Sequence, residues 1–188
     1  MSSSLPLVVS LAAFVALFAA AVTDLKARTI PNGLVLVVFA LGMAARLLSG
    51  GKTLWLNLLI AAVVYVVGAV LTHYEVIGGG DTKMIAAVTV LVPPAVVPAL
   101  LICIALAGGL LSLFYLAAGW LVRRSGGAAV ALGQPVPGAS DFDQIVRLEV
   151  ARMQANEPMP YGVAIFSGAG GLVLIGILSC ISATSCSL

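Results

Sequence analysis

Long apolar runs alternate with short polar connections along almost the whole chain. Six of these runs are candidates for membrane-spanning helices: residues 5–22, 33–48, 54–71, 82–92, 95–122 and 162–181. A helix that crosses a bilayer needs about 20 predominantly apolar residues, within a range of about 17–25. The run at 82–92 is short, and Pro93 and Pro94 mark the turn before the next helix. The pattern therefore predicts an all-α polytopic membrane protein, with six transmembrane helices in one domain over residues 1–188.

The composition agrees with this prediction. The 188 residues are 62% hydrophobic and 9% charged, whereas a soluble domain averages about 25% charged residues. A soluble fold of this length has no interior large enough to hide so much apolar surface, so we expect a lipid bilayer to cover it. The net charge of +2 is small and its charges are dispersed, which gives no indication of a nucleic-acid partner.

Basic residues predict the orientation of the helices. The first, third and fifth connections hold seven Lys and Arg residues, against two in the second and fourth. Basic connections stay in the cytoplasm, so the odd connections are predicted to be cytoplasmic and both termini to lie outside. A cleaved signal peptide is the alternative for residues 5–21, but residues 1–6 contain no basic side chain. We therefore favour a retained first helix.

The fifth connection, residues 123–160, is the one sizeable polar segment. Residues 125–139 are rich in Gly, Ala and Pro, which predicts a loop. Ser140 and the acidic residues after it are typical of a helix start with a serine cap. Apolar side chains then recur at helical spacing, with Arg147 and Glu149 opposite them. This pattern predicts a short helix on the cytoplasmic interface.

The three cysteines contain no C-x-x-C pair, so neither a zinc ribbon nor a redox motif is predicted. Cys103 falls inside an apolar run, where we expect it to pack as a small residue. Cys180 and Cys186 lie close together in the sequence and would pair if that end of the chain lies in an oxidising compartment. The sequence indicates no metal site and no cofactor.

Two aspartates stand at the edges of apolar runs. Asp24 ends the first run and Asp81 opens the fourth, and carboxylates are costly at or near hydrocarbon. Each has a structural interpretation: Asp24 as a solvated helix end, and Asp81 as an acidic residue in a first helical turn, where the helix dipole favours its charge. Together, on one membrane face, they are the working parts of an aspartic peptidase. Such an enzyme needs one ionised carboxylate to take a proton from water and one protonated carboxyl to polarise the scissile carbonyl.

Both aspartates belong to compact motifs, and a third motif opens the last run. The motif residues are Asp24 with Ile30, Pro31 and Asn32; Gly78, Gly80, Asp81 and Lys83; and Pro160, Tyr161 and Gly162. In these motifs, in their order and in its predicted spans, the chain resembles the type IV prepilin peptidases, membrane aspartic peptidases of the GxGD type.

The resemblance implies an endopeptidase that removes the basic leader of prepilin or pseudopilin substrates at the cytoplasmic face of the bacterial inner membrane. It implies that Asp24 and Asp81 are catalytic and that the other motif residues support them. Larger members of the family carry an extra domain with paired C-x-x-C motifs and also N-methylate the new terminus. This chain has neither that domain nor those cysteines, so it resembles the short form of Flp-type, tight-adherence pilus systems, without methylation.

Two other functions stay open at this point. A small ion- or proton-coupled transporter component would bind its cation with intramembrane carboxylates, near the midplane and within an internal repeat. A non-catalytic scaffold of a secretion system would use glycine-rich faces, such as residues 108–109 and 168–171, for helix packing. Lys83 has an alternative role as a positive-inside anchor, and His73 and Glu75 are interpreted as an interfacial pair. The sequence indicates no oligomeric state.

Overall fold

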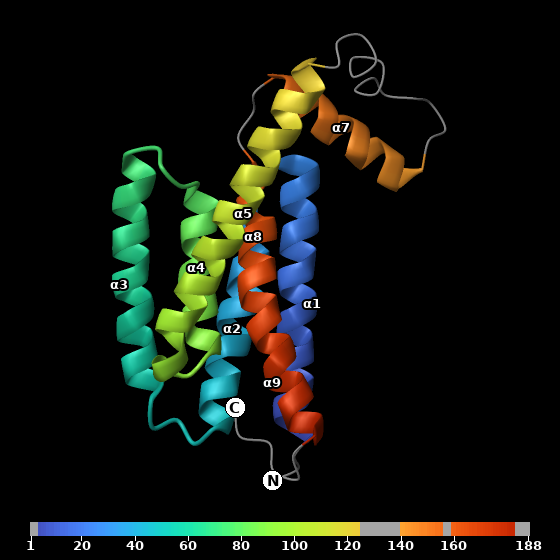
Figure 1. The fold of residues 1–188 in the computed structure, drawn as a ribbon. Helices are drawn as coiled ribbons and strands as arrows, with labels where there is room; N and C mark the ends of the chain where they lie inside the picture. Colours follow the sequence, from blue (N-terminus) through green and yellow to red (C-terminus); the bar gives the residue numbers. More distant parts are fainter. Residues whose placement is uncertain (1–3, 125–139, 156–158, 183–188) are drawn as a thin grey trace. The chain divides into compact units, whose positions relative to one another are not determined.

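The computed structural model describes residues 4–124, 140–155 and 159–182, which are helical throughout apart from short connections and contain no strand. In chain order the elements are α1 (Ser4–Ala27), α2 (Asn32–Leu48), α3 (Leu54–His73), α4 (Gly79–Leu91), η1 (Pro94–Val96), α5 (Val97–Arg124), α7 (Asp141–Ala155), α8 (Tyr161–Ile165), the π-helical segment η2 (Phe166–Gly170) and α9 (Gly171–Ser182) (Figure 1). The all-α prediction is confirmed for these residues. The chain forms two compact units, one of residues 1–107 with 161–188 and one of residues 108–160.

Not every predicted span has the length of a membrane crossing. Within the described residues, three helices are long and apolar enough to cross a bilayer: Leu7–Ala27, Leu54–His73 and Pro94–Leu121. Asn32–Leu48 and Tyr161–Ile177 are shorter apolar helices. Helix α4 has 13 residues, which at 1.5 Å per residue is about 20 Å, less than the roughly 30 Å of a hydrocarbon core. The prediction of six transmembrane helices is therefore not confirmed.

Helix α1 continues past the predicted end of its run. The predicted span ends at residue 22, but the helix continues to Ala27. Arg28 then adopts a left-handed conformation with φ 53° and donates its N–H to the carbonyl of Asp24, which closes the helix. Asp24 therefore lies in the last turn of α1 rather than beyond it.

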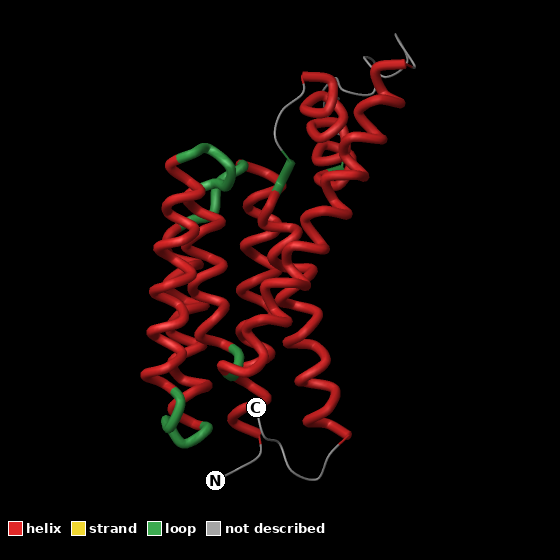
Figure 2. Tube along the Cα trace, turned by 60° about the vertical axis from the view of Figure 1, so that its left-hand side comes forward, coloured by secondary structure: helices red, strands yellow, loops and turns green. Residues whose placement is uncertain are grey.

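In the first unit, α4 lies between α2 and α3, which both pack along it but barely touch each other (Figures 1 and 2). Helix α1 packs against α2 and against α8, η2 and α9, which form one continuous helix over residues 161–182. Helix α8 also contacts α4. The N-terminal ends of α4 and α8 thus lie in the same packed unit as the C-terminal end of α1.

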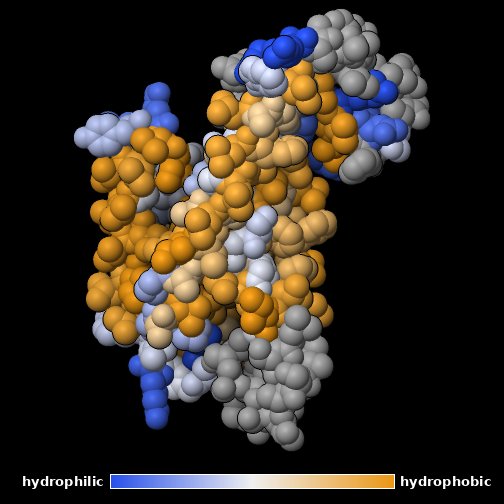
Figure 3. Space-filling model, viewed as in Figure 1, coloured by the Kyte–Doolittle hydropathy of each residue, from blue (hydrophilic) through white to orange (hydrophobic). Residues whose placement is uncertain are grey.

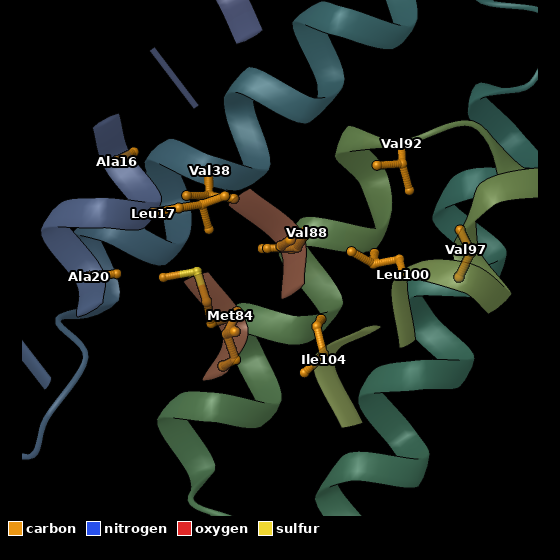
Figure 4. Packing of buried hydrophobic residues seen from close by; sticks show 13 residues of the cluster. Ala16, Leu17, Ala20, Val38, Met84, Val88, Val92, Val97, Leu100 and Ile104 are labelled. Carbon is orange, nitrogen blue, oxygen red and sulfur yellow. The ribbon is translucent and has the colours of Figure 1, made fainter. Parts of the chain in front are cut away.

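The main core cluster joins these helices. Its largest fully buried side chains are Leu17 of α1, Met84 of α4 and Leu100 of α5, which Figure 4 labels, together with Ile165 of α8. Burying one such side chain contributes about 1.5–3 kcal/mol. The core therefore fixes α1, α4 and α8 relative to one another, and these are the helices that carry the candidate site.

Apolar side chains also cover the outward faces of the helices. Figure 3 shows hydrophobic residues over most of the visible surface of α3 and α5. On α3, Trp55 is 83% exposed near one end and Tyr74 is 71% exposed just past the other. Trp and Tyr are enriched at the two interfaces of a bilayer. Helix α3 thus has the surface of a membrane span bounded by an aromatic residue at each end.

The second unit contains the latter part of α5 and α7. Ser140 Oγ accepts a hydrogen bond from the N–H of Asp143 at 3.2 Å, so the predicted serine cap is confirmed. Glu149, which the sequence placed on the polar face, is buried instead. Its carboxylate accepts hydrogen bonds from Tyr115 Oη at 2.7 Å and from Arg152 Nη1 at 2.8 Å. Because Tyr115 belongs to α5, its hydrogen bond to Glu149 joins α7 to α5.

Two predictions cannot be compared with the structure: the loop at 125–139 lies outside the described residues, and the pairing of Cys180 with Cys186 rests on side chains that are not described. Cys103 is half-buried and free. The interfacial position of α7 and the orientation of the whole chain stay predictions.

The close packing of the last helix on α5 gives the first prediction. A Cβ added at Gly168 would lie 2.6 Å from the backbone nitrogen of Ile104, whereas one added at Gly171 would have no atom within 4 Å. Gly168→Ala therefore overpacks a backbone contact and should lower the free energy of unfolding by about 1–3 kcal/mol. Thermal unfolding in detergent measures this. Gly171→Ala is the control and should be neutral or stabilising; equal melting temperatures for the two variants would contradict the packing.

Candidate active site

Asp24 is held by the N-terminal end of the last helix. Its side chain is 6% exposed, and its Oδ2 accepts a hydrogen bond from the backbone N–H of Gly162 at 2.7 Å. Gly162 is the second residue of α8, where N–H groups have no partner within their own helix. The positive end of the helix dipole also lies there. The carboxylate of Asp24 is thus bound by an N–H donor that the helix leaves available.

Gly162 has no side chain because Asp24 takes its place. A Cβ at Gly162 would lie 2.8 Å from Cβ of Asp24 and 2.9 Å from its Oδ2, distances that real Cβ contacts do not reach. The sequence singled out Gly162 as a motif residue but did not indicate this contact, which joins residues 138 positions apart.

Asp81 lies in the first turn of α4, as the sequence predicted. The backbone N–H of Gly78, the residue that precedes the helix, donates to the carboxylate of Asp81. This is the reciprocal half of a capping box, in which the third helical residue reaches back to the N-cap N–H. A Cβ at Gly78 would lie 2.6 Å from Asp81 Oδ2. Gly78 is therefore needed where the carboxylate folds back over the backbone, and Asp81 caps the start of its own helix.

The two carboxylates lie close enough for the charge of Asp24 to act on Asp81. Asp81 precedes the apolar part of α4 and lies outside the predicted span at 82–92. Burial and the negative charge of Asp24 raise the pKa of Asp81 to about 6, against the opposing effect of the hydrogen bond from Gly78. At and below about pH 6, therefore, Asp81 keeps its proton over a range where an ordinary aspartate would have lost it. A neighbouring pair in which one member keeps a proton is the arrangement that acid–base chemistry on water requires.

The first motif supports this pair through the connection between α1 and α2. Pro31 is the N-cap of α2 and its carbonyl accepts from the N–H of Leu34 at 3.0 Å, so it stands one position before the helix that it opens. Ile30 is the nearest neighbour of Gly80, with 3.5 Å between Ile30 Cβ and a Cβ built on the glycine. The connection thus packs against the first turn of α4, next to Asp81.

Lys83 contacts α2 rather than the aspartates. Its Nζ donates to Asn32 Oδ1 at 3.3 Å, and both side chains are exposed. Residues two apart on a helix point roughly 200° apart, so Lys83 and Asp81 lie on different faces of α4. Lys83 and Asn32 join the ends of α4 and α2 and line a mainly apolar cavity of about 490 Å³ between α2, α3 and α4.

The third motif begins the last helix. Pro160 is buried and directly precedes Tyr161, the first residue of α8. Tyr161 is half-buried and packs against the main core cluster. Gly162 follows as the residue whose N–H binds Asp24.

Two further features lie beside Thr82, the residue after Asp81. Thr82 is buried against α3, where its hydroxyl lies 2.9 Å from that of Thr72 and donates to the carbonyl of Gly68 at 3.3 Å. On the same side, an apolar cavity of about 380 Å³ lies between α3, α4 and Leu101 of α5, with Ile77 and Thr82 in its lining. Sequence reasoning missed Thr82 and Thr72. In the part of the chain that the structure describes, no cluster of three or more His, Cys, Asp or Glu side chains forms a metal site.

These features define a class: a helical, lipid-facing protein with two acidic side chains brought together at helix ends. Residues 11–113, more than half of the chain, match the model of the type IV leader peptidase family. The chain therefore belongs to this family, which confirms the resemblance to prepilin peptidases. The matched segment contains the first two motifs and ends before the third. Comparisons with curated proteins and with solved structures gave no match.

The contact between Gly162 and Asp24 gives a second prediction. Gly162→Ala pushes the carboxylate of Asp24 aside, and a displacement of about 1 Å at a reacting group costs about 100-fold in rate. We expect peptidase activity on a prepilin to fall by about that factor while the helical circular-dichroism spectrum is kept. Gly33→Ala is the control, because a Cβ there meets no atom within 4 Å. Native activity in Gly162→Ala would show that the contact does not position Asp24.

Proposed function

We propose that this protein is a membrane aspartic endopeptidase that removes the leader peptide of type IV prepilin-like proteins, with Asp24 and Asp81 as its catalytic residues. The observation that carries this proposal is the convergence of the two carboxylates from helices far apart in sequence, one bound by Gly162 and the other by Gly78. Membership of a leader peptidase family supplies the class of reaction and a prepilin-type substrate.

Each carboxylate acts in both steps of the proposed mechanism, once as an acid and once as a base. Asp24 takes a proton from a water molecule, whose oxygen attacks the scissile carbonyl carbon, while Asp81 gives its proton to the carbonyl oxygen. In the resulting tetrahedral intermediate the C–N bond then breaks; Asp24 protonates the leaving amine and Asp81 recovers the proton from the hydroxyl. The hydrogen bond from Gly162 orients Asp24 as an acceptor, and the raised pKa of Asp81 supports its role as the acid.

The finer features of the proposal concern substrate and location. Lys26, Arg28 and Lys83 lie near the two aspartates in sequence, and basic connections favour the cytoplasmic face of the inner membrane. The sequence lacks the paired C-x-x-C motifs of the larger family members, which supports a short, Flp-type enzyme that does not methylate its product. The apolar cavity next to Thr82 supplies a surface for apolar side chains that flank the cut.

The first test exchanges the carboxylates. Asp24→Asn and Asp81→Asn keep the size of each side chain but remove its acid–base function, so each should lower the rate of leader removal by about 10²–10⁴-fold. Cleavage of a co-expressed Flp-type prepilin, followed by the shift in its electrophoretic mobility, measures this. Asp143→Asn, at an exposed position of α7, is the matched control and should cleave at the native rate. Undiminished cleavage by either site variant refutes the assignment.

The second test is the pH dependence of cleavage. The acid role requires the protonated form of Asp81, and this form is lost as the pH rises through its pKa of about 6. The rate should therefore fall about tenfold for each pH unit above that value. Initial rates of purified protein between pH 5 and 8 show this limb. Samples held at pH 8 and returned to pH 6 should regain full activity, which separates titration from unfolding; a rate that stays constant up to pH 8 contradicts the acid role.

A further inference from the structure

Helix α4 is too short to cross a bilayer. Its C-terminal end lies among buried residues. Val90, Leu91 and Val92 are all buried. The last four carbonyl groups of an α-helix have no partner within the helix. Away from water, each unsatisfied backbone group is strongly destabilising. The end of α4 therefore needs hydrogen-bond donors from elsewhere in the protein.

Two side chains from the neighbouring helices supply these donors. Asn57 of α3 is fully buried, and its Nδ2 donates to the carbonyls of Thr89 at 3.2 Å and Val92 at 2.8 Å. Arg46 of α2 is 3% exposed, and its Nη2 donates to the carbonyl of Leu91 at 3.1 Å. The cation of Arg46 also lies at the negative end of the helix dipole of α4. Three carbonyls at this end are thus bound from two sides.

The donors fix how far α4 reaches along the bundle. A shift of one residue moves a helix by 1.5 Å along its axis and turns it by roughly 100°, which would break these hydrogen bonds. The backbone of α4 also lies against Gly42 of α2, where an added Cβ would be 3.0 Å from the nitrogen of Leu91. Nearer the N-terminal end, Thr82 is hydrogen-bonded to Thr72 of α3. Helix α4 is therefore held at both ends by polar contacts with its two neighbours.

We propose that Arg46 and Asn57 are positioning residues of the peptidase: by binding the C-terminal carbonyls of α4, they set its depth and hold Asp81 level with Asp24. Neither residue touches the carboxylates; ten residues of rigid helix, about 15 Å, separate Leu91 from Asp81. The inference rests on the proposed function for its effect on catalysis. Its effect on the position of α4 is independent of that function.

A crosslink measures the position of α4 without any catalysis. The 3.5 Å between Cβ of Ile30 and a Cβ built on Gly80 lies within the range that disulfides need, about 3.5–4.5 Å. The pair Ile30→Cys and Gly80→Cys, in a chain with Cys103, Cys180 and Cys186 replaced by alanine, should therefore crosslink readily in membranes. The yield then reports whether the first turn of α4 lies at its native level beside the α1–α2 connection.

Adding Asn57→Leu or Arg46→Met should lower the initial rate of crosslinking at least about fivefold, whereas Arg46→Lys, which keeps a donor and a charge, should retain most of it. Gly168→Ala, which overpacks the contact of the last helix with α5, is the control for a general loss of stability and should leave the crosslinking rate unchanged. If Asn57→Leu does not accumulate in membranes, Asn57→Gln replaces it. The glutamine amide lies one methylene further from the backbone than the asparagine amide, so this variant should also slow the crosslink. Native crosslinking in the folded variants overturns the proposal.

Kinetics complete the test in the chain without the engineered cysteines. Asn57→Leu and Arg46→Met should lower kcat for prepilin cleavage by about 10–100-fold, with KM within about twofold, because the reacting groups move while the substrate surface is kept. Arg46→Lys should restore most of kcat. A native kcat in the Asn57 and Arg46 variants contradicts the positioning role even if the aspartate exchanges abolish cleavage. Conversely, slower crosslinking together with undiminished cleavage by Asp24→Asn refutes the proposed function and leaves the placement of α4 supported.

Discussion

Placing two carboxylates side by side in a partly buried site is the constraint on which the first unit of this protein depends. Like charges repel more strongly in a partly buried site than in water, because the effective dielectric constant is lower there. The structure opposes this repulsion with N–H donors from two helix N-termini: Gly78 of the α4 cap binds Asp81, and Gly162 of α8 binds Asp24. Both donors are glycines whose missing side chains leave room for the carboxylate. Burial, together with the repulsion that remains, raises the pKa of Asp81.

Backbone groups without a partner in their own helix are also important at the other end of α4. A helix of 13 residues begins beside the aspartates and ends among buried residues, so its free N–H groups serve the site while its free carbonyls need donors. Asn57 and Arg46 supply those donors. The short helix is therefore tied to α2 and α3 where it ends and to α3 through Thr82 near its start. Its depth, and with it the level of Asp81, follows from hydrogen bonding as much as from apolar packing.

Local patterns in the sequence predicted much of this, and long-range contacts account for what they missed. The apolar runs predicted the helices, the start of the fourth run predicted that Asp81 lies in a first helical turn, and Ser140 predicted the start of α7, because each depends on residues close together in the chain. The contact of Gly162 with Asp24 spans 138 positions, which no local pattern encodes. Asn57, an amide inside a predicted span, was a signal that sequence reasoning passed over. Glu149 was misplaced because its burial depends on Tyr115, 34 residues away.

The central claim is that Asp24 and Asp81 act as a coupled pair. The most direct test is to measure the protonation of Asp81 spectroscopically. Infrared difference spectroscopy resolves the C=O stretch of a protonated carboxyl, and the band of Asp81 can be identified by its loss in Asp81→Asn. If the two aspartates are coupled, this band should disappear as the pH rises through about 6 and should titrate at lower pH in Asp24→Asn, where the neighbouring charge is gone. A titration that is the same with and without Asp24 would show that the two carboxylates do not act as a pair.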